Sequence, residues 1–307
     1  MNLYLPEGRR YNPNKQFDEN EIARLSATGE VAESICILSD SARNMHIRLG
    51  ECVGIIPQGE SGLLSLTGLT DYTLSRAGKP VCFTVIGFLE DKRILLSRKS
   101  AQQQCVDEYI SRLQLGDIIP ARITGIKSYG VFADIGCGIY ALLPIDYMSM
   151  SCISSPTERF KYNQDIFAAV KSIENGSDPK FPGGKITLTH RELLGTWEEN
   201  AAYFTSGQTV PAIVRSVEEF GAFVELTPNL TGLTDNNNGF EKNALVSVYI
   251  KAINPKRMKV KLCQSRDEYP NATYDGRTYR YMKNRGRIRD FNYSPYDAEK
   301  QITTVFY

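Results

Sequence analysis

Short segments in which apolar and polar residues alternate dominate the chain. Residues 210–217 are rich in β-branched side chains, and residues 223–226 and 245–253 alternate as strands with one buried face do. Glycine marks joints between such segments, as in Leu230-Thr231-Gly232. Five short strands in roughly 70 residues favour a small closed barrel over a sandwich, because closure removes the exposed sheet edges.

The strand pattern repeats at a constant offset. Gly116 and Gly207 open similar segments 91 residues apart, and Tyr129 and Phe220 are also 91 residues apart. Self-similarity at a fixed period is typical of tandem domains. The sequence therefore predicts two equivalent barrels.

A third, degraded copy lies upstream. Gly29 precedes Gly116 by 87 residues, and Pro57 precedes Pro144 by the same number. The position equivalent to the first repeated aromatic residue falls within residues 42–45, Ala-Arg-Asn-Met, where no aromatic residue occurs. We expect this copy to bind nucleic acid poorly through that face, and to pack against the second barrel or a protein partner.

Helical stretches separate the copies. Ala101, Cys105, Tyr109 and Leu113 recur every four residues and form an apolar stripe, and a similar stripe runs from Leu193 through Trp197 to Phe204. The predicted organisation is an N-terminal extension at 1–24, a degenerate barrel at 25–99, a linker helix at 100–113, a barrel at 114–190, a linker helix at 191–204, a barrel at 205–266 and a basic, aromatic-rich tail at 267–307.

Composition narrows the function. The chain has 307 residues and a net charge of +1, so any binding of a polyanion must come from local patches rather than from bulk charge. The seven cysteines are odd in number and widely spaced, which argues against a disulfide framework or a zinc site and favours a reducing compartment. We expect a cytoplasmic protein, because the N-terminus does not resemble a secretory signal and no long apolar run occurs.

Enzymatic chemistry finds little support in the residues. The chain has only two histidines, no glycine-rich phosphate loop and no pair of carboxylates suitably placed beside a base. We therefore expect no catalytic residues, no metal and no cofactor. His46 and His190 are expected at the surface or as caps, and Cys137, between two glycines, in an exposed turn.

The candidate binding residues are the repeated aromatic pairs. Tyr129 and Phe132 flank one strand start beside a glycine, and Phe220 and Phe223 do the same in the next copy. Flat rings on a barrel face give nucleobases a stacking platform. The alternative is that one ring of each pair fills the mouth of its own barrel.

Cations accompany these rings. Lys185 and Lys259 stand at corresponding positions at the start of the last strand of their copies. In the third copy, Arg257, Lys256 and Lys261 add further positive charge. Such cations contact phosphates beside a stacking platform, although a single lysine at a strand start is commonly a solvated surface residue.

The C-terminal tail interleaves arginine and tyrosine. Its apolar periodicity is poor, so we expect it to be extended or disordered when free. Its composition fits contact with structured RNA through phosphate pairing and ring stacking, or a solubilising tail.

The order of these motifs resembles a known family. Gly207-Gln208-Thr209-Val210, Phe220-Gly221-Ala222-Phe223, Gly232-Leu233 and Lys259-Val260-Lys261-Leu262 are similar to the S1 RNA-binding domain, a five-stranded OB-fold barrel. The linker at 193–200 is similar to those between repeats of bacterial ribosomal protein S1, and the chain most resembles its short, three-repeat clostridial form. One departure is that Pro144 and Asp235 stand where the family often has histidine.

This resemblance implies a fold and a function. The fold is mainly β, with three tandem five-stranded OB-fold barrels of the S1 type joined by short helices. The implied activity is binding of single-stranded RNA across the face carrying Tyr129, Phe132, Phe220 and Phe223. The implied role is to bring messenger RNA to the small ribosomal subunit. We expect the protein to be monomeric and not to bind a membrane. The alternative is a protein-interaction scaffold that docks on the ribosome or on a ribonuclease complex.

Overall fold

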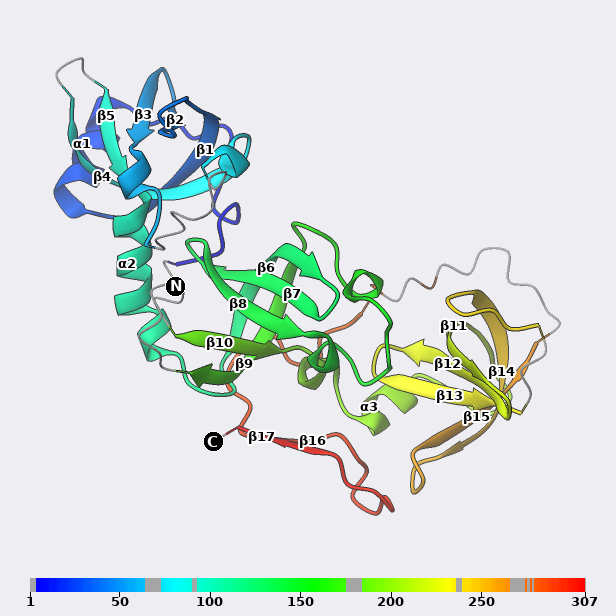
Figure 1. The fold of residues 1–307 in the computed structure, drawn as a ribbon. Helices are drawn as coiled ribbons and strands as arrows, with labels where there is room; N and C mark the ends of the chain where they lie inside the picture. The colour runs from blue at the N-terminus through cyan, green and yellow to red at the C-terminus, as the bar shows by residue number, and fades with distance from the viewer. Residues whose placement is uncertain are drawn as a thin grey trace.

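Three closed β-barrels in a row make up the protein (Figure 1). The computed structural model describes residues 4–63, 73–89, 93–174, 184–235, 239–265, 274, 277 and 279–306. Each barrel has five strands, which confirms the predicted fold class.

The first barrel follows helix α1 (Glu19–Thr28). Its strands are β1 (Ala32–Ser39), β2 (Met45–Leu49), β3 (Cys52–Ile56), β4 (Pro80–Phe88) and β5 (Ile94–Ser97), with 3-10 turns η1 (Gln58–Glu60) and η3 (Leu74–Arg76) between β3 and β4. They close in the order β1-β2-β3-β5-β4, and β3 runs parallel to β5.

The second and third barrels repeat this topology. The second contains β6 (Ile118–Lys127), β7 (Gly130–Gly136), β8 (Ile139–Pro144), β9 (Asp165–Glu174) and β10 (Lys185–Thr189), with η5 (Ile145–Tyr147) and η6 (Pro156–Glu158). The third contains β11 (Thr209–Glu218), β12 (Gly221–Thr227), β13 (Leu230–Thr234), β14 (Leu245–Asn254) and β15 (Lys259–Gln264). In both, the third and fifth strands are parallel. Alternate residues point inward along each strand, such as Ile119, Ala121 and Ile123 of β6, and fill the barrel core.

Short helices connect the barrels. Helix α2 (Arg98–Glu108) begins at Ser97, whose hydroxyl accepts a hydrogen bond from the Ser100 amide, and η4 (Ile110–Arg112) continues from it. Before the third barrel lie η7 (Arg191–Leu194) and α3 (Trp197–Ala201). Thr196 and Glu199 form a capping box that starts α3, and Trp197, the first residue of this helix, is buried.

The first barrel packs against the second through buried charge. Glu7, in the N-terminal segment, accepts hydrogen bonds from Arg98 Nε at 2.7 Å and from Arg76 Nη1 at 2.9 Å. Its backbone amide donates to Asp134 of the second barrel at 2.8 Å. Because Glu7, Arg98 and Asp134 are all buried, each carboxylate depends on these partners for the solvation it has lost.

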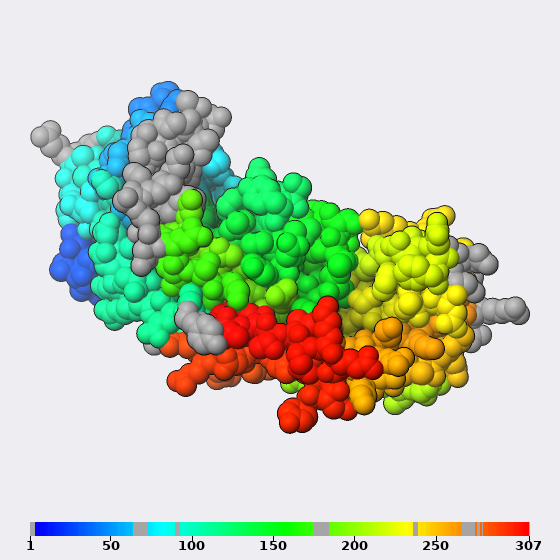
Figure 2. Space-filling view, turned by 60° about the horizontal axis from the view of Figure 1, so that its bottom comes forward, coloured from blue at the N-terminus to red at the C-terminus, as the bar shows by residue number. Residues whose placement is uncertain are grey.

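The described stretch of the C-terminal tail, 279–306, is largely extended and packs against the barrels, so of the two expected alternatives, extended or disordered, the structure has the extended one. The backbone of Ile288 pairs with that of Gly116, and β16 (Asp290–Asn292) pairs with β17 (Thr303–Val305). Figure 2 shows the segment, orange to red, lying along the second and third barrels. The apolar pattern of the tail did not predict this packing, because the tail has no continuous apolar face. It is anchored instead by single rings, such as Tyr279 and Tyr281, that pack against the second barrel. Residues 267–273 of the predicted tail lie outside the described residues.

Two further expectations were met only in part. His190 is the N-cap residue of η7, as one of its two expected roles required, but it is completely buried. Its ring lies among Phe160, Tyr279 and Tyr281 at centroid distances of 4.8–5.4 Å. Cys137 does occupy a turn, with a φ of 47°, but that turn is covered by the N-terminal segment and α2. Both burials depend on segments distant in sequence. None of the helices in the described parts of the chain is long and apolar enough to cross a membrane.

Candidate nucleic-acid interface

Glycine places the aromatic pairs. A side-chain carbon on Gly130 would lie 2.6 Å from the carbonyl oxygen of Leu143, and one on Gly221 would lie 2.1 Å from that of Thr234. Gly221 also has a φ of 150°, which other residues rarely adopt. The glycine thus lets the second strand of each barrel approach the third closely, and it fixes where the neighbouring rings project.

The two aromatic pairs have the same geometry. The ring centroids of Tyr129 and Phe132 are 6.3 Å apart with planes at 90°, and those of Phe220 and Phe223 are 6.2 Å apart at 88°. Tyr129 is 55% exposed, Phe220 62% and Phe223 37%, whereas Phe132 is half-buried. Three of the four rings are therefore accessible at the surface, and the two rings of each pair make an edge-to-face contact.

Strand register shows which side chains share the face with these rings. Phe132 pairs with Leu142 of β8, which neighbours Thr187 of β10. In the third barrel, Phe223 pairs with Leu233, which neighbours Lys261. Lys261 was expected only as an addition to the cationic patch, yet it lies in the same cross-strand row as Phe223. The repeat alignment could have found it, as the equivalent of Thr187.

Lys185 and Lys259 lie two residues before this row on their strands. Both are exposed, and their side chains point to the same outer surface as Thr187 and Lys261, because residues two apart in a strand share a face. Each lysine is therefore displaced from the aromatic row by about 7 Å along the strand. A phosphate one nucleotide away from a stacked base is within their reach.

Arg257 lies apart from the rings. It occupies the turn between β14 and β15, at the end of the barrel opposite Phe220, because β13 and β15 are parallel. Its Nε atom lies 3.2 Å from a carboxylate oxygen of Glu299 in the tail. The structure therefore does not bring Arg257 together with the aromatic pair.

The charges beside the two pairs differ. Lys127 is exposed at the end of β6 next to Tyr129, whereas the equivalent position before Phe220 is Glu218. Asp235, which follows β13, is paired with Lys251, and the hydrogen bond from this lysine lowers the pKa of Asp235. The repulsion that Asp235 alone would exert on a phosphate is thereby reduced.

The first barrel has a histidine in the ring position. His46 pairs with Ile55, which neighbours Leu95, and this row corresponds to Phe132, Leu142 and Thr187. The Nε2 atom of His46 lies 3.1 Å from Asp40, and this hydrogen bond lowers the pKa of Asp40 to about 2. Counting along the sequence missed the position by one residue, because the turn between β1 and β2 is one residue longer: Ser39 pairs with Met45, whereas the equivalent Ile126 pairs with Val131.

Metal-ligating chemistry is not apparent. Across the described ranges, no group of three or more His, Cys, Asp or Glu side chains is arranged to hold a metal ion.

Comparison with known proteins agrees with this architecture. Residues 112–177 match the family model described as S1 RNA binding domain. The match covers most of the second barrel, so this part of the chain is similar to the S1 RNA-binding domain.

Two bacterial relatives are named as the small ribosomal subunit protein bS1 or its homolog. The chain is 30% identical over 149 residues to small ribosomal subunit protein bS1 of Staphylococcus aureus (strain COL), an alignment that covers 47% of this chain and 36% of that protein. It is 27% identical over 186 residues to the small ribosomal subunit protein bS1 homolog of Bacillus subtilis (strain 168), covering 59% and 46%. The chain thus spans less than half the length of these relatives.

A solved structure is also similar over much of the chain. It is a multidomain protein with nucleic acid binding domains from Streptococcus pneumoniae, 12% identical, which covers 78% of this chain and 74% of that one with a TM-score of 0.25.

Proposed function

We propose that the chain binds single-stranded RNA by stacking bases on the exposed rings of its second and third barrels. The observation that carries this proposal is the repeated geometry of the two aromatic pairs on the outer surface. Stacking on aromatic side chains contributes about 1–3 kcal/mol per base and tolerates any base. Lys185 and Lys259 contact the backbone phosphates beside the rings, and Arg257 contacts the RNA farther along the third barrel.

The biological role follows from the relatives. The bS1 proteins are named as parts of the small ribosomal subunit, and we infer that this chain presents messenger RNA to that subunit in the cytoplasm. We propose that it acts as a monomer and without a cofactor or a catalytic step.

Photo-crosslinking tests where RNA lies. An oligouridylate containing 4-thiouridine is irradiated with the full chain, and crosslinked peptides are identified by mass spectrometry. We expect crosslinks at Tyr129, Phe132, Phe220 and Phe223. Crosslinks confined to the first barrel would overturn the assignment.

A scaffold that docks on the ribosome or on a ribonuclease complex is the second candidate. The first barrel favours it, because this barrel lacks the aromatic pair and exposes Phe88 (60%) and Ile86 (45%). The two functions are separated by ribosome co-sedimentation of a variant whose four rings are replaced by alanine. A scaffold would still co-sediment after it had lost affinity for naked RNA.

A further inference from the structure

The folded tail divides its aromatic and basic residues between two sides. Tyr279 packs against Phe160 and His190, and Tyr281 packs against Phe167, so these tyrosines are used as anchors. The cations between and after them point outward and are exposed: Arg280, Lys283, Arg285, Arg287 and Arg289. We call these five side chains the basic ridge.

The backbone beneath the ridge is fixed. Ile288 is buried, its amide donates to the Gly116 carbonyl at 2.9 Å, and the Ile118 amide donates to the Gly286 carbonyl at 2.9 Å. Gly116 permits this approach, because a side-chain carbon there would lie 1.8 Å from the carbonyl oxygen of Ile288. The cations therefore project from an ordered segment, and ordering it on binding would cost little further entropy.

The ridge concentrates charge of one sign. Residues 279–289 contain five cations and no acidic residue, in a chain whose net charge is +1. Arg287 is positioned by Asp117, at 2.6 Å from its Nε atom, and by Gln114. Local charge of this density attracts a polyanion where the protein as a whole does not.

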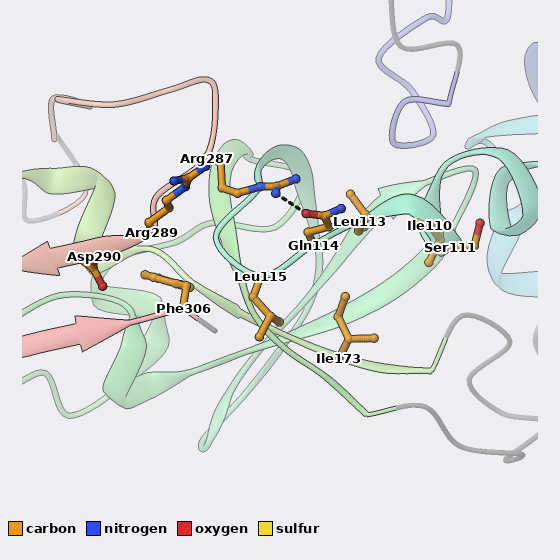
Figure 3. A pocket seen from close by; sticks show the side chains of 10 residues that line it. All are labelled: Ile110, Ser111, Leu113, Gln114, Leu115, Ile173, Arg287, Arg289, Asp290 and Phe306. Carbon is orange, nitrogen blue, oxygen red and sulfur yellow. Dashed lines mark hydrogen bonds between the residues drawn. The ribbon is translucent and has the colours of Figure 1, made fainter.

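A hollow lies beside the C-terminal end of the ridge. Its volume is about 650 Å³, and Arg287 and Arg289 stand at one side of it above Leu115 and Phe306 (Figure 3). Lys171 lies over the Phe306 ring at 4.9 Å and covers one face of it. The hollow is also lined by Asp290, and it offers two guanidinium groups over an apolar floor. The two guanidinium groups suit a phosphate together with its ribose.

We propose that the basic ridge is a second nucleic-acid surface, which contacts the phosphate backbone of double-stranded RNA. The aromatic pairs present rings to unpaired bases. The basic ridge presents cations, while the neighbouring rings of Tyr279 and Tyr281 are packed against the second barrel. A duplex hides its bases and displays two ordered rows of phosphates, so it is recognised by shape and charge. This proposal extends the proposed function but does not depend on the aromatic pairs.

The test compares two ligands in salt titrations. The variant Arg285→Gln with Arg289→Gln removes two ridge cations and leaves the Arg287–Asp117 pair intact. The matched control, Arg48→Gln with Lys99→Gln, removes two exposed cations from the first barrel and α2. The probes are an RNA hairpin with a long duplex stem and an unstructured oligouridylate. Fluorescence of Trp197, whose backbone amide donates to Tyr293 in the tail, reports whether the tail remains docked.

We expect the ridge variant to bind the hairpin at least tenfold more weakly. The slope of log affinity against log salt should fall by about two, because each lost phosphate contact reduces it by about one. Oligouridylate binding should stay within threefold, and the control should resemble the parent. Hairpin affinity unchanged in the ridge variant, or reduced equally in the control, would overturn the proposal. So would a ridge that binds polyglutamate as tightly as the hairpin, because it would then serve an acidic protein. Failure of the stacking proposal appears separately, as oligouridylate binding that survives loss of the four rings.

Discussion

Arg159 of the second barrel and Glu225 of the third form an ion pair in which both side chains are completely buried, with Nη2 and Oε2 2.5 Å apart. Arg215 donates to the same carboxylate through Nε and Nη2, at 2.7 and 3.0 Å, and also pairs with Glu158. The two proposed RNA-binding barrels are thus joined by a charge network whose shared carboxylate and two guanidinium groups are buried. Glu225 occupies in the repeat the position of Asp134, which lies at the junction between the first and second barrels.

Removing the shared carboxylate should disrupt this junction. In Glu225→Gln, the buried guanidinium of Arg159 loses the charge of Glu225, whereas Arg215 keeps its pair with Glu158. Breaking a buried ion pair by removing one partner costs about 3–5 kcal/mol. We expect a loss of that order in the free energy of unfolding of the second and third barrels, measured with urea. The control Glu198→Gln changes an exposed carboxylate on α3 and should alter stability by less than about 0.5 kcal/mol. Equal stability of the two variants would show that the network adds nothing.

The junction between the first and second barrels should loosen as pH rises. Burial raises the pKa of Glu33 to about 7, although the backbone amides of Gly8 and Arg10 donate to its carboxylate. Between about pH 4.5 and 7 the folded state therefore binds more protons than the unfolded state, so stability falls with increasing pH. The loss across this range is on the order of 3 kcal/mol. In Glu33→Gln the dependence should flatten, as measured by urea unfolding at successive pH values, and a profile unchanged from the parent would contradict the assignment.

The packing of the tail on the second barrel should respond to pH in the opposite direction. Burial lowers the pKa of His190 to about 4, and its Nε2 atom lies 3.1 Å from the hydroxyl of Tyr281. Between about pH 4 and 6.5 the unfolded state binds more protons, so stability is lost as pH falls through this range. We expect the tail to release on acidification, seen as earlier cleavage by a protease within residues 279–289. The variant His190→Gln should remove this sensitivity, and a parent chain that resists cleavage equally at pH 4.5 and pH 7 would refute it.

Loss of the glycine beside the rings should damage the aromatic face of the third barrel. In Gly221→Ala, the new side-chain carbon meets the Thr234 carbonyl at a φ of 150°, so the strand must shift. We expect a destabilisation of about 2–3 kcal/mol and weaker RNA binding. Gly87→Ala is a suitable comparison, because nothing lies within 4 Å of its added carbon. If both variants behave alike, the close approach of β12 to β13 does not position Phe220.

The internal repeat determined how much of the fold and of the candidate site could be predicted from the sequence. The 91-residue offset that relates Gly116 to Gly207 predicted barrels of the same topology, and the aromatic pairs were found because they recur at that offset. The tail could not be predicted, because Tyr279 and Tyr281 pack on His190 and Phe167, which lie far away in the sequence. The proximity of Lys261 to Phe223 could not be predicted from spacing along the chain, because it depends on which strands pair and in which register.

The most direct test of the central claim is a fluorescence anisotropy titration with unstructured oligouridylate. Replacing Phe220 and Phe223 by alanine should weaken binding at least tenfold, since two stacking contacts are lost. Tyr296→Ala serves as the control, because this tyrosine is 99% exposed in the tail and outside the barrels. Replacing Tyr129 and Phe132 as well should weaken binding further. Affinity within twofold of the parent after loss of all four rings would contradict the account.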